Sequence, residues 1–566
     1  MIPPKSKAKT KKAPAAKAVV PVATRASHAA IAKFDLSPIL EALRKRVPKG
    51  QAAEAEAFAR GFYARMTRDE YVEHGAEGWA ALAAGMLEFA GTRKRDKANV
   101  RLFNATMKDN GWESPHTVLQ IVNDDMPFLV DSVTMALAEE GIGVHVLGHP
   151  VVPLSRDKAG RLTGVGEGTN ESFIHIEIDR QPQDAMAKIE KRVRAVLDDV
   201  RASVADWSQM RDRMLAVAEE LPSHRIPVSD AGRAEAQEFL RWAADNHFTF
   251  LGYREYTVES VPAKGGGKEE VLVAHAESGL GLLRGKDGRP PRPLASLAAH
   301  YMPQSGSVDA LILTKTNARA TVHRPGYMDY IGVLSFDAKG KPVREQRFLG
   351  LYTSSAYNRR PWDIPLVRER YEHVMRESGL RPASHSGKAL RHIMESLPRD
   401  ELFQSTESEL FQTATGILGL QERVRSKLFL RRDRYGRFFS VLVYVPRDRH
   451  DTQMRHRIEA MLKEALQGEH VDTGVHMGES PLAQLHLIVR PRAGAQVEVN
   501  EAELEKRLAH IVRDWQDELA EQLAARHGEE RGLQFAARYG RALPAGYIEE
   551  VSPQVAATDV EHLASL

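Results

Sequence analysis

Between positions 117 and 146 the hydrophobic residues change from the spacing of a strand to that of a helix and back. Residues 117–122 are mostly apolar and predict a strand. A helix is expected next, with Asp125 as its N-cap, Pro127 in its first turn and Gly141 at its end. The buried stripe of this helix comprises Met126, Leu129, Val130, Val133 and Leu137. A second apolar run follows Gly141 and predicts another strand.

The pattern continues with a third strand and a second helix. Residues 171–179 alternate, with Ile174, Ile176 and Ile178 on one face and polar residues on the other. Residues 185–200 have the apolar spacing of an amphipathic helix. The predicted order is therefore β-α-β-β-α, the order of a ferredoxin-like unit with an antiparallel sheet.

The same order recurs in the last third of the chain. Residues 438–445 alternate as a strand, Asp451 can cap the helix that follows, and Gly468 can end it. Residues 470–478 and 482–490 predict two further strands. One long helix is expected to complete the copy, with apolar positions at Leu504, Leu508, Ile511, Trp515, Leu519 and Leu523.

Between the two copies the pattern predicts a mixed antiparallel module. A helix over 234–246 precedes a strand over 247–256, and residues 330–355 have the alternation of a hairpin. A helix is expected over 364–379, and two more over 385–427. The predicted fold class is thus α+β and multidomain, with two ferredoxin-like units flanking a mixed antiparallel domain and with helical connectors.

The start of the chain differs from the rest in composition. Residues 35–98 have a helical pattern, whereas the first 34 residues contain eight Lys or Arg and no acid. A signal peptide would need a longer apolar run than the one that Pro21 interrupts. We therefore expect a disordered basic tail over 1–34.

Composition excludes several kinds of chemistry. The 566 residues include no cysteine, which excludes disulfides, thiolate nucleophiles and cysteine-ligated zinc. The 79 basic and 76 acidic residues give a net charge of +3, which does not favour nucleic acid or an anionic membrane as a partner. Because no apolar run is long enough for a transmembrane helix, we expect a cytoplasmic protein.

Several long motifs resemble one enzyme family. They are NDDMPFLVDSV at 123–133, HFTFLGYREY at 247–256, RFLGLYTSSAYN at 347–358, RDRYGRFFSVLVYVPRDR at 432–449 and LPAGYIEEVSPQVAATDVEHL at 543–563. In this order they resemble the N-terminal half of the large bacterial NAD-specific glutamate dehydrogenases. The resemblance extends over residues 35–566.

The resemblance implies ACT-like regulatory domains with a PAS-like domain between them. After the basic tail at 1–34, it implies a helical segment with the first ACT-like domain at 35–225, a PAS-like domain at 226–380, a helical connector at 381–430, a second ACT-like domain at 431–530 and a C-terminal segment at 531–566 that leads to further domains. The family oxidises L-glutamate to 2-oxoglutarate and ammonium with NAD, in a domain further along the chain. We therefore expect part of such an enzyme, from a truncated or split gene, with no catalytic residue of its own.

Local motifs favour no cofactor or metal site in this chain. GVGEG at 164–168 and GLGLLRG at 279–285 do not follow the strand-to-helix pattern of a dinucleotide site. The lysine-glycine run Lys264–Gly267 reads as a hairpin tip, and no nucleophile-elbow pattern occurs. No acid completes a metal site with the three histidines of the first copy, His145, His149 and His175.

The first strand-to-helix turn is the candidate effector site. The resemblance implies that small effectors, often amino acids, bind near such a turn, and a helix N-terminus offers N–H groups to a carboxylate. Asp124 or Asp125 would take the amino group. Phe128 stands where the family has a glycine, and packing and assembly are the alternative role. The candidate residues are Asn123, Asp124, Asp125, Met126, Pro127, Phe128 and Leu129.

The predicted function is the regulatory and oligomer-forming region of an NAD-dependent glutamate dehydrogenase, with NAD as a cofactor of the full-length family only. The expected partners are further copies of the chain, a separately encoded or missing C-terminal dehydrogenase half and an amino-acid effector, whereas nucleic acid and membrane are not expected. The alternative is a free-standing amino-acid sensor or scaffold with ACT-like domains and no catalysis. A neighbouring gene for the dehydrogenase half would favour the first function.

Overall fold

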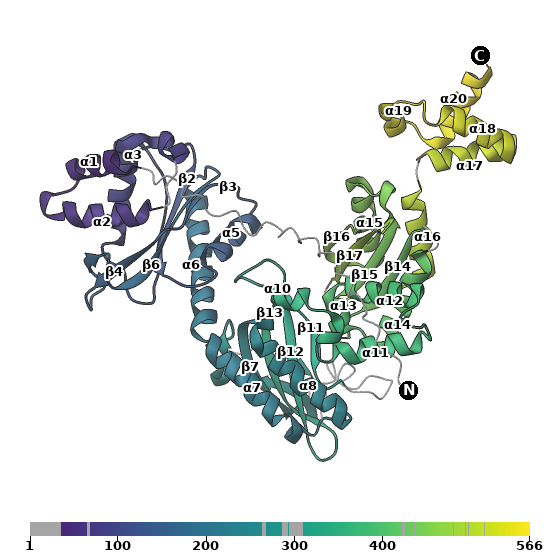
Figure 1. The fold of residues 1–566 in the computed structure, drawn as a ribbon, viewed down its shortest axis with the longest axis horizontal. Helices are drawn as coiled ribbons and strands as arrows, with labels where there is room; N and C mark the ends of the chain where they lie inside the picture. The colour runs from purple at the N-terminus through teal and green to yellow at the C-terminus, as the bar shows by residue number, and fades with distance from the viewer. Residues whose placement is uncertain are drawn as a thin grey trace, which may run out of the picture. The chain divides into compact units, whose positions relative to one another are not determined.

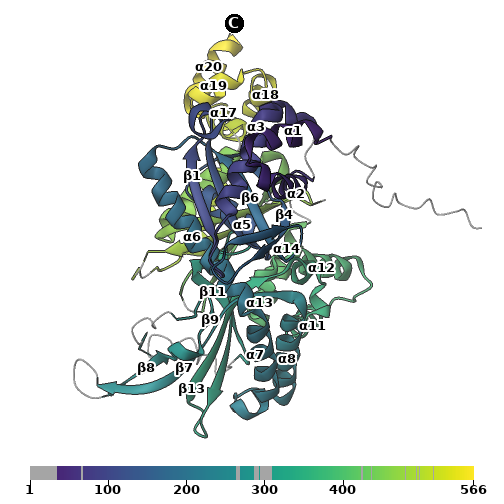
Figure 2. The same ribbon diagram turned by 90° about the vertical axis from the view of Figure 1, so that its left-hand side faces the viewer.

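The protein consists of helices and antiparallel sheets in two compact units (Figures 1 and 2). A computed structural model describes residues 35–64, 68–262, 268–285, 292–293, 309–421, 425–434, 436–478, 480–492, 494–495, 497–513 and 515–565. The first unit comprises the described residues up to Met126 together with Leu137–Arg194, and the second comprises Pro127–Ala136 and the described residues from Ala195 onward. The predicted α+β class is confirmed.

An antiparallel sheet forms the centre of the first unit. Its strand order is β1-β2-β6-β4-β5, with β3 also paired to β6. The strands are β1 Asn99–Asn104, β2 Thr117–Asp124, β3 Val144–Gly148, β4 Val151–Arg156, β5 Leu162–Val165 and β6 Thr169–Ile178. The helices along this stretch are α4 Met107–Asn110, α5 Leu129–Glu139 and α6 Gln183–Ala205. The predicted β-α-β-β-α order is present only in outline. The single strand expected over 142–152 is in fact two, β3 and β4, which are separated at His149 and Pro150. β1 precedes the predicted order, and the short strand β5 lies between β4 and β6 in the chain.

Both faces of this sheet are buried. Phe173 of β6 packs with Val118 and Val122 of β2 in a core that includes Phe58 and Phe62. This core joins the sheet to three helices, α1 Ser37–Arg46, α2 Ala52–Phe62 and α3 Arg68–Ala90. The three isoleucines of β6 are also fully buried. Figure 1 shows α1–α3 on one side of the sheet and α6 on the other. His175 and Glu177, which alternate with the isoleucines, therefore lie under the layer of α1–α3.

The second unit begins with a larger antiparallel sheet. Its order is β10-β8-β7-β13-β12-β11, with β9 also paired to β7. The strands are β7 Phe248–Pro262, β8 Lys268–Ala274, β9 Leu280–Gly281, β10 Arg292–Pro293, β11 Ile312–Arg319, β12 Tyr327–Phe336 and β13 Pro342–Tyr352. The helices α7 Trp207–Glu220 and α8 Asp230–Trp242 precede it in the chain and share its core. The predicted hairpin is confirmed, because β12 and β13 pair antiparallel from Asp329↔Gly350 to Phe336↔Pro342.

Helices connect this sheet to the next. They are α10 Ser354–Asn358, α11 Val367–Glu377, α12 His385–Ser396, α13 Arg399–Gln404 and α14 Glu407–Gln421. The prediction of two helices over 385–427 is wrong, because three occur there. Pro398 separates α12 from α13, and the side chain of Thr406 accepts a hydrogen bond from the backbone of Glu409 to start α14.

A four-stranded sheet repeats the arrangement of the first unit. Its order is β14-β15-β17-β16, with β14 Lys427–Arg432, β15 Phe439–Pro446, β16 Gly468–His476 and β17 Leu482–Pro491. The helices α15 Thr452–Ala465 and α16 Glu501–Val512 cover one face. Asp451 caps α15 as predicted, since its Oδ1 accepts the hydrogen bond of Met454 N at 2.6 Å. β14 is a leading strand that the pattern did not reveal.

The long helix predicted for this copy is in fact two helices. The second, α17 Trp515–His527, belongs to a small bundle with α18 Glu529–Tyr539, α19 Ala545–Glu550 and α20 Pro553–Ser565. Leu504 and Leu508 pack against the sheet, whereas Leu519 and Leu523 pack against α20. The apolar spacing continues from α16 into α17, although the two helices pack against different elements. The spacing alone therefore did not reveal two helices.

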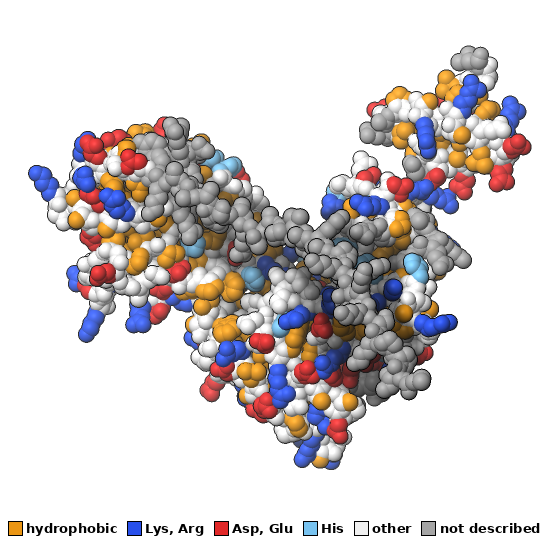
Figure 3. All heavy atoms as spheres, viewed as in Figure 1, with side chains coloured by type: hydrophobic (Ala, Val, Ile, Leu, Met, Phe, Trp, Pro, Cys, Tyr) orange, Lys and Arg blue, Asp and Glu red, His pale blue; other side chains and the backbone are white. Residues whose placement is uncertain are grey.

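The surface carries both signs of charge. Figure 3 shows basic and acidic side chains interspersed on the face in view. Of the helices that the structure describes, none is long and apolar enough to cross a membrane.

Candidate functional site

The predicted effector turn, residues 123–129, joins β2 to α5. Phe128 adopts a left-handed φ of 71°, and its carbonyl accepts the hydrogen bond of Ser132 N at 3.0 Å. Phe128 therefore occupies the N-cap position, and the prediction that Asp125 caps this helix is wrong. Asp125 instead continues the extended chain, because its N–H donates to the carbonyl of Asn170 at 3.1 Å.

The backbone of this turn is strained. A side chain in the left-handed region costs about 1–3 kcal/mol, and a bulky residue is rare there. The ring of Phe128 packs against the ring of His323, with 4.7 Å between ring centroids, and His323 itself has a φ of 79°. The backbone N–H of His323 donates to Ser132 Oγ at 3.1 Å. Two strained residues thus support each other at the start of α5.

Asp124 belongs to a buried network of acids and arginines. Arg93 donates to Asp124 and, at 3.0 Å, to Oε1 of Glu171. Arg156 holds both oxygens of Glu171, at 2.6 and 2.8 Å. Burial opposes ionisation of Glu171, but the hydrogen bonds from Arg156 and Arg93 outweigh it and hold the pKa of this carboxyl below its usual value. The network fastens the end of β2 to β4 and β6.

Asp125 has a different set of partners. Its Oδ1 accepts the hydroxyl of Ser172 at 2.7 Å, and Nε2 of His149 lies 3.0 Å from the same hydroxyl. Burial lowers the pKa of His149, so its neutral form is favoured. The side-chain amide of Asn123 donates to the carbonyl of Asp124 at 3.1 Å.

The seven candidate residues thus form one continuous turn, but both carboxylates already hold protein groups. Asp125 and Pro127 are exposed, whereas Leu129 is buried. An amino group could reach Asp125 from solvent, while Asp124 would have to release Arg93. Sequence reasoning missed Arg93, Glu171 and Ser172. Arg93 lies 31 residues from Asp124, and Ser172 lies 47 from Asp125, so no local spacing connects them to the turn.

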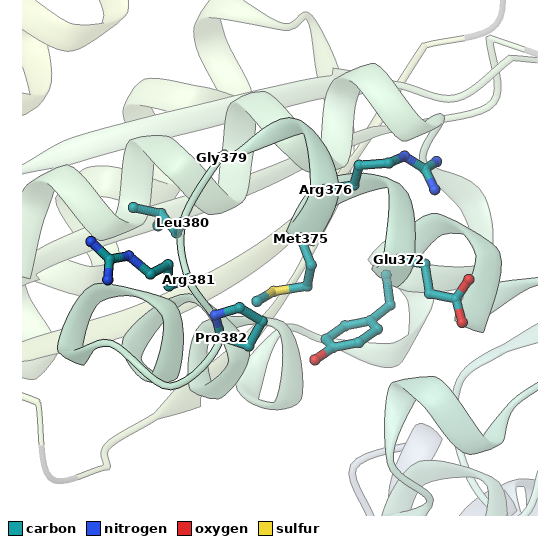
Figure 4. A pocket seen from close by; sticks show the side chains of 8 residues that line it. Glu372, Met375, Arg376, Gly379, Leu380, Arg381 and Pro382 are labelled. Carbon is teal, nitrogen blue, oxygen red and sulfur yellow. The ribbon is translucent and has the colours of Figure 1, made fainter.

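A surface hollow, separate from the predicted effector turn, lies at the end of α11 (Figure 4). Its apolar floor is formed by Tyr371, Met375, Leu380 and Pro382, and charged side chains lie at its rim. Arg376 and Arg381 point away from the hollow in Figure 4. It is an open surface groove in which no polar groups converge on a ligand position.

The predicted sheet histidines do not come together. His145 pairs with Asp179 at 2.8 Å, His149 with Ser172, and His175 with Gln120 at 3.2 Å. Among the residues that the structure describes, no group of three potential ligands could hold a metal ion.

The structure describes two of the three glycine-rich segments, and Lys264–Gly267 is not among them. GVGEG at 164–168 joins strand β5 to strand β6, with Gly166 and Gly168 at positive φ. GLGLLRG at 279–285 contains the short strand β9 and a turn. Lys264–Gly267 lies outside the described residues. GVGEG therefore lacks the strand-to-helix turn of a dinucleotide site.

Known families match four segments of the chain. The glutamate dehydrogenase ACT1 domain matches residues 58–193, and the ACT2 domain of the same enzymes matches 427–516. Helical motif 1 of glutamate dehydrogenase matches 364–423, and helical motif 2 matches 522–566. The two ACT matches include the six-stranded sheet and the four-stranded sheet, whose shared strands follow the same order.

Curated relatives match most of the chain. The NAD-specific glutamate dehydrogenase of Halomonas elongata is 35% identical over 94% of this chain and 34% of its own length. That of Pseudomonas aeruginosa is 34% identical over 95% of this chain and 33% of its own length. That of Mycobacterium tuberculosis is 28% identical over 79% and 27%, respectively. The chain thus spans about a third of the length of the first two relatives.

Proposed function

The chain belongs to the family of the NAD-specific glutamate dehydrogenases, and from this premise we propose that it is a regulatory and assembly region of such an enzyme. The observation that carries the proposal is the pair of ACT domains, in which β1-β2-β6-β3 of the first sheet follows the order of β14-β15-β17-β16 in the second. The module between them, residues 226–380, is PAS-like in this proposal, which its antiparallel sheet and flanking helices support. The reaction of the whole enzyme is oxidation of L-glutamate with NAD to 2-oxoglutarate and ammonium.

In this proposal the chain regulates the chemistry and does not perform it. The strand-turn-strand geometry of GVGEG supports this, because it gives no helix N-terminus for a pyrophosphate. The test follows NADH absorbance with saturating glutamate and NAD. We expect no turnover by the purified 566-residue chain; turnover would overturn the proposal.

The effector would be an amino acid at the turn 123–129. The exposed carboxylate of Asp125 is available to an ammonium group, and α5 begins four residues later in the chain, at Leu129. Coupling of about 1–3 kcal/mol between this turn and catalysis would change activity several-fold to about a hundredfold. A thermal-shift screen of the twenty amino acids at millimolar concentration tests binding, since a ligand of the folded state raises the unfolding temperature.

A variant of Asp125 with nearly the same size and shape tests whether an amino acid binds at this residue. Asp125→Asn keeps the size of the side chain and an oxygen for the Ser172 hydroxyl, but it removes the charge that an ammonium needs. We expect the amino-acid shift of wild type to disappear in this variant. An equal shift in both proteins would place the effector elsewhere.

Assembly would use further copies of the chain. β3 and β16 are the corresponding strands of the two ACT sheets, and each carries exposed apolar side chains, Val144 and Leu147 in β3 and Val475 in β16. Such strand edges are ready to pair with another chain. Light scattering of the purified chain should therefore give at least a dimer mass, and a monomer at micromolar concentration would contradict this.

A further inference from the structure

A loop of the seven-stranded sheet lies against the first turn of α5. Residues 320–326 join β11 to β12, and the N–H of Ala320 donates to the carbonyl of Gly326 at 2.8 Å, which closes the loop at its base. Val322, near the middle of the loop, is fully buried. The start of α5, Pro127–Ala136, belongs to the same compact unit as this loop. The contacts between them are therefore contacts within one unit.

Three contacts hold the loop against the helices α5 and α6. The backbone N–H of His323 donates at 3.1 Å to Oγ of Ser132, a fully buried residue of α5. Oγ1 of Thr321 donates to Oδ2 of Asp199 in α6 at 2.8 Å. The rings of His323 and Phe128 pack together, with 4.7 Å between their centroids. The loop thus supports α5 at its first residues.

The other side of the loop is anchored in the sheet and the helix that follows it. Nη2 of Arg324 donates to the carbonyl of Tyr352 at the end of β13 at 3.0 Å, and its guanidinium lies 5.6 Å from the ring centroid of Tyr357 in α10. The backbone N–H of Tyr352 donates to Asp329 at 2.9 Å, and Asp329 accepts from Lys315 at 2.7 Å. A shift of β13 or α10 would therefore move the loop as well.

Two residues of this contact have a backbone conformation that is rare for large side chains. Phe128 and His323 have φ angles of 71° and 79°, in the left-handed region. A side chain is disfavoured there because its Cβ comes too close to the following carbonyl oxygen. Such strain persists only where the surrounding structure fixes the backbone. Release of the loop would therefore allow Phe128 to leave the left-handed region.

The local sequence favours an earlier start for α5. Proline is preferred as the first residue of a helix, because its fixed φ suits the helix and its missing N–H is not needed there. If Pro127 were that residue, Phe128 would be helical, and the N–H groups of Val130 and Asp131 would donate to carbonyls four residues earlier. In the observed fold α5 begins at Leu129. Both N–H groups then belong to the first turn, which has no acceptor within the helix.

We propose that the loop 320–326 is a latch that selects between these two starts of α5. With the loop in place, Phe128 stays strained and α5 begins at Leu129. With the loop released, α5 begins at Pro127, and the turn 123–129 changes shape. The inference goes beyond the proposed function, because it needs no effector. One consequence does rest on that function: an effector that binds one start more tightly would shift the loop in turn.

Hydrogen exchange of the whole chain, resolved to single amides by fragmentation of the peptides, tests the latch. Arg324→Met keeps the length of the side chain but removes the bond to Tyr352, and Ser132→Ala removes the acceptor on α5. Each variant should release the loop. We then expect exchange at Val130 and Asp131 to slow about tenfold, because both N–H groups gain acceptors.

The direction of the change distinguishes a latch from a simple support. If the loop only stabilised the helix, its release would make the first turn of α5 exchange faster. Exchange of β15 at the wild-type rate shows that a variant is folded. Unchanged or faster exchange at both Val130 and Asp131 in a folded variant would overturn the proposal.

Two controls complete the test. Glycine tolerates the left-handed region and is unfavourable within a helix, so Phe128→Gly should keep the late start. Arg324→Met in that background should leave exchange at Val130 and Asp131 unchanged. Asp337→Ala loosens the turn between β12 and β13, where the carboxylate accepts two backbone N–H groups at 2.8 and 2.9 Å. It should also leave both amides unchanged, and slower exchange in either control would overturn the proposal.

Discussion

The two ACT domains carry a histidine at the same place in the sheet but surround it differently. The central strands pair as far as Asp124↔Glu171 in the first domain and Pro446↔Leu482 in the second. His175 lies four positions after Glu171 in its strand, and His486 lies four positions after Leu482. Equivalent backbone positions thus hold the same residue type.

The partners of the two histidines come from different sources. His175 has Gln120 as its cross-strand neighbour and an acid from its own strand, Glu177. His486 has Leu442 as its cross-strand neighbour and an acid from helix α13, Glu401, at 3.7 Å. Nε2 of His486 lies 2.9 Å from the hydroxyl of Ser440, which donates to Glu401, whereas Leu442 offers no hydrogen bond. The fold therefore places the histidine, and the neighbours decide what it contacts.

The largest expected effect is in the second domain. Nη2 and Nε of Arg431 donate to the two oxygens of buried Glu401 at 2.8 and 3.0 Å, and Ser440 donates to it at 2.6 Å. Arg431→Met leaves the carboxylate buried without its cation, which should cost about 3–5 kcal/mol. Native-state hydrogen exchange of β14 and β15 measures the loss.

Two controls show whether the cost comes from the unpaired charge. Glu401→Leu combined with Arg431→Met removes both charges and should restore most of the stability. Arg507→Ala removes an exposed partner of Glu464 and should cost less than about 1 kcal/mol. A double variant as unstable as Arg431→Met would show that packing, rather than charge, causes the loss.

The two strand-to-helix turns should differ in backbone strain. Phe128 has a positive φ, whereas Arg447, which follows β15, starts a 3-10 turn with no positive φ. Phe128→Gly and Phe128→Ala both remove the ring, but only glycine relieves the backbone, so the glycine variant should be more stable by about 1–3 kcal/mol. At Arg447 the order should reverse, by about 0.5–1 kcal/mol. Thermal unfolding of the four variants measures both differences.

The second domain should keep its stability in mild acid. Burial opposes ionisation of Glu401, but Arg431 and His486 hold its pKa well below the usual 4.5. A lowered carboxyl pKa contributes stability above the unfolded value, and this is lost only as pH falls through the folded value. Between pH 7.5 and 5.5 we therefore expect no change in the hydrogen exchange of β15. Faster exchange of β15 at pH 5.5 would contradict this expectation.

The smallest expected difference concerns the two aspartates that the sequence presents as helix caps. Asp451 caps α15, so Asp451→Ala should cost about 1 kcal/mol. Asp125 does not cap α5 but accepts the hydroxyl of Ser172, so in a Ser172→Ala background Asp125→Ala should cost less than about 0.5 kcal/mol. Thermal unfolding of the two variants and of Asp451→Asn, which retains the cap, gives the comparison. Equal costs at both positions would contradict the assigned N-cap.

These aspartates also show how far sequence reasoning reaches. Both precede an apolar helical stripe, and the same cap was predicted for each. At Asp451 the helix starts at the next residue and the prediction is confirmed. At Asp125 the chain stays extended for pairing with Asn170, and the helix starts only at Leu129. A cap depends on the backbone conformation of the residues after it, which side-chain type alone does not determine.

The sequence by itself determined the repeated order of strands and helices and the residues of the first turn. Periodicity could do this because burial on one side of a strand or helix imposes its spacing on the chain directly. Only the tertiary structure decided the leading strands β1 and β14, the break between α16 and α17, and the partners of Asp124 and His175. Arg93 contacts Glu171, which lies 78 residues later in the chain, and Glu401 of helix α13 lies beside His486 of strand β17. Such contacts depend on how the elements pack against one another, and this packing produces no periodic pattern in the sequence.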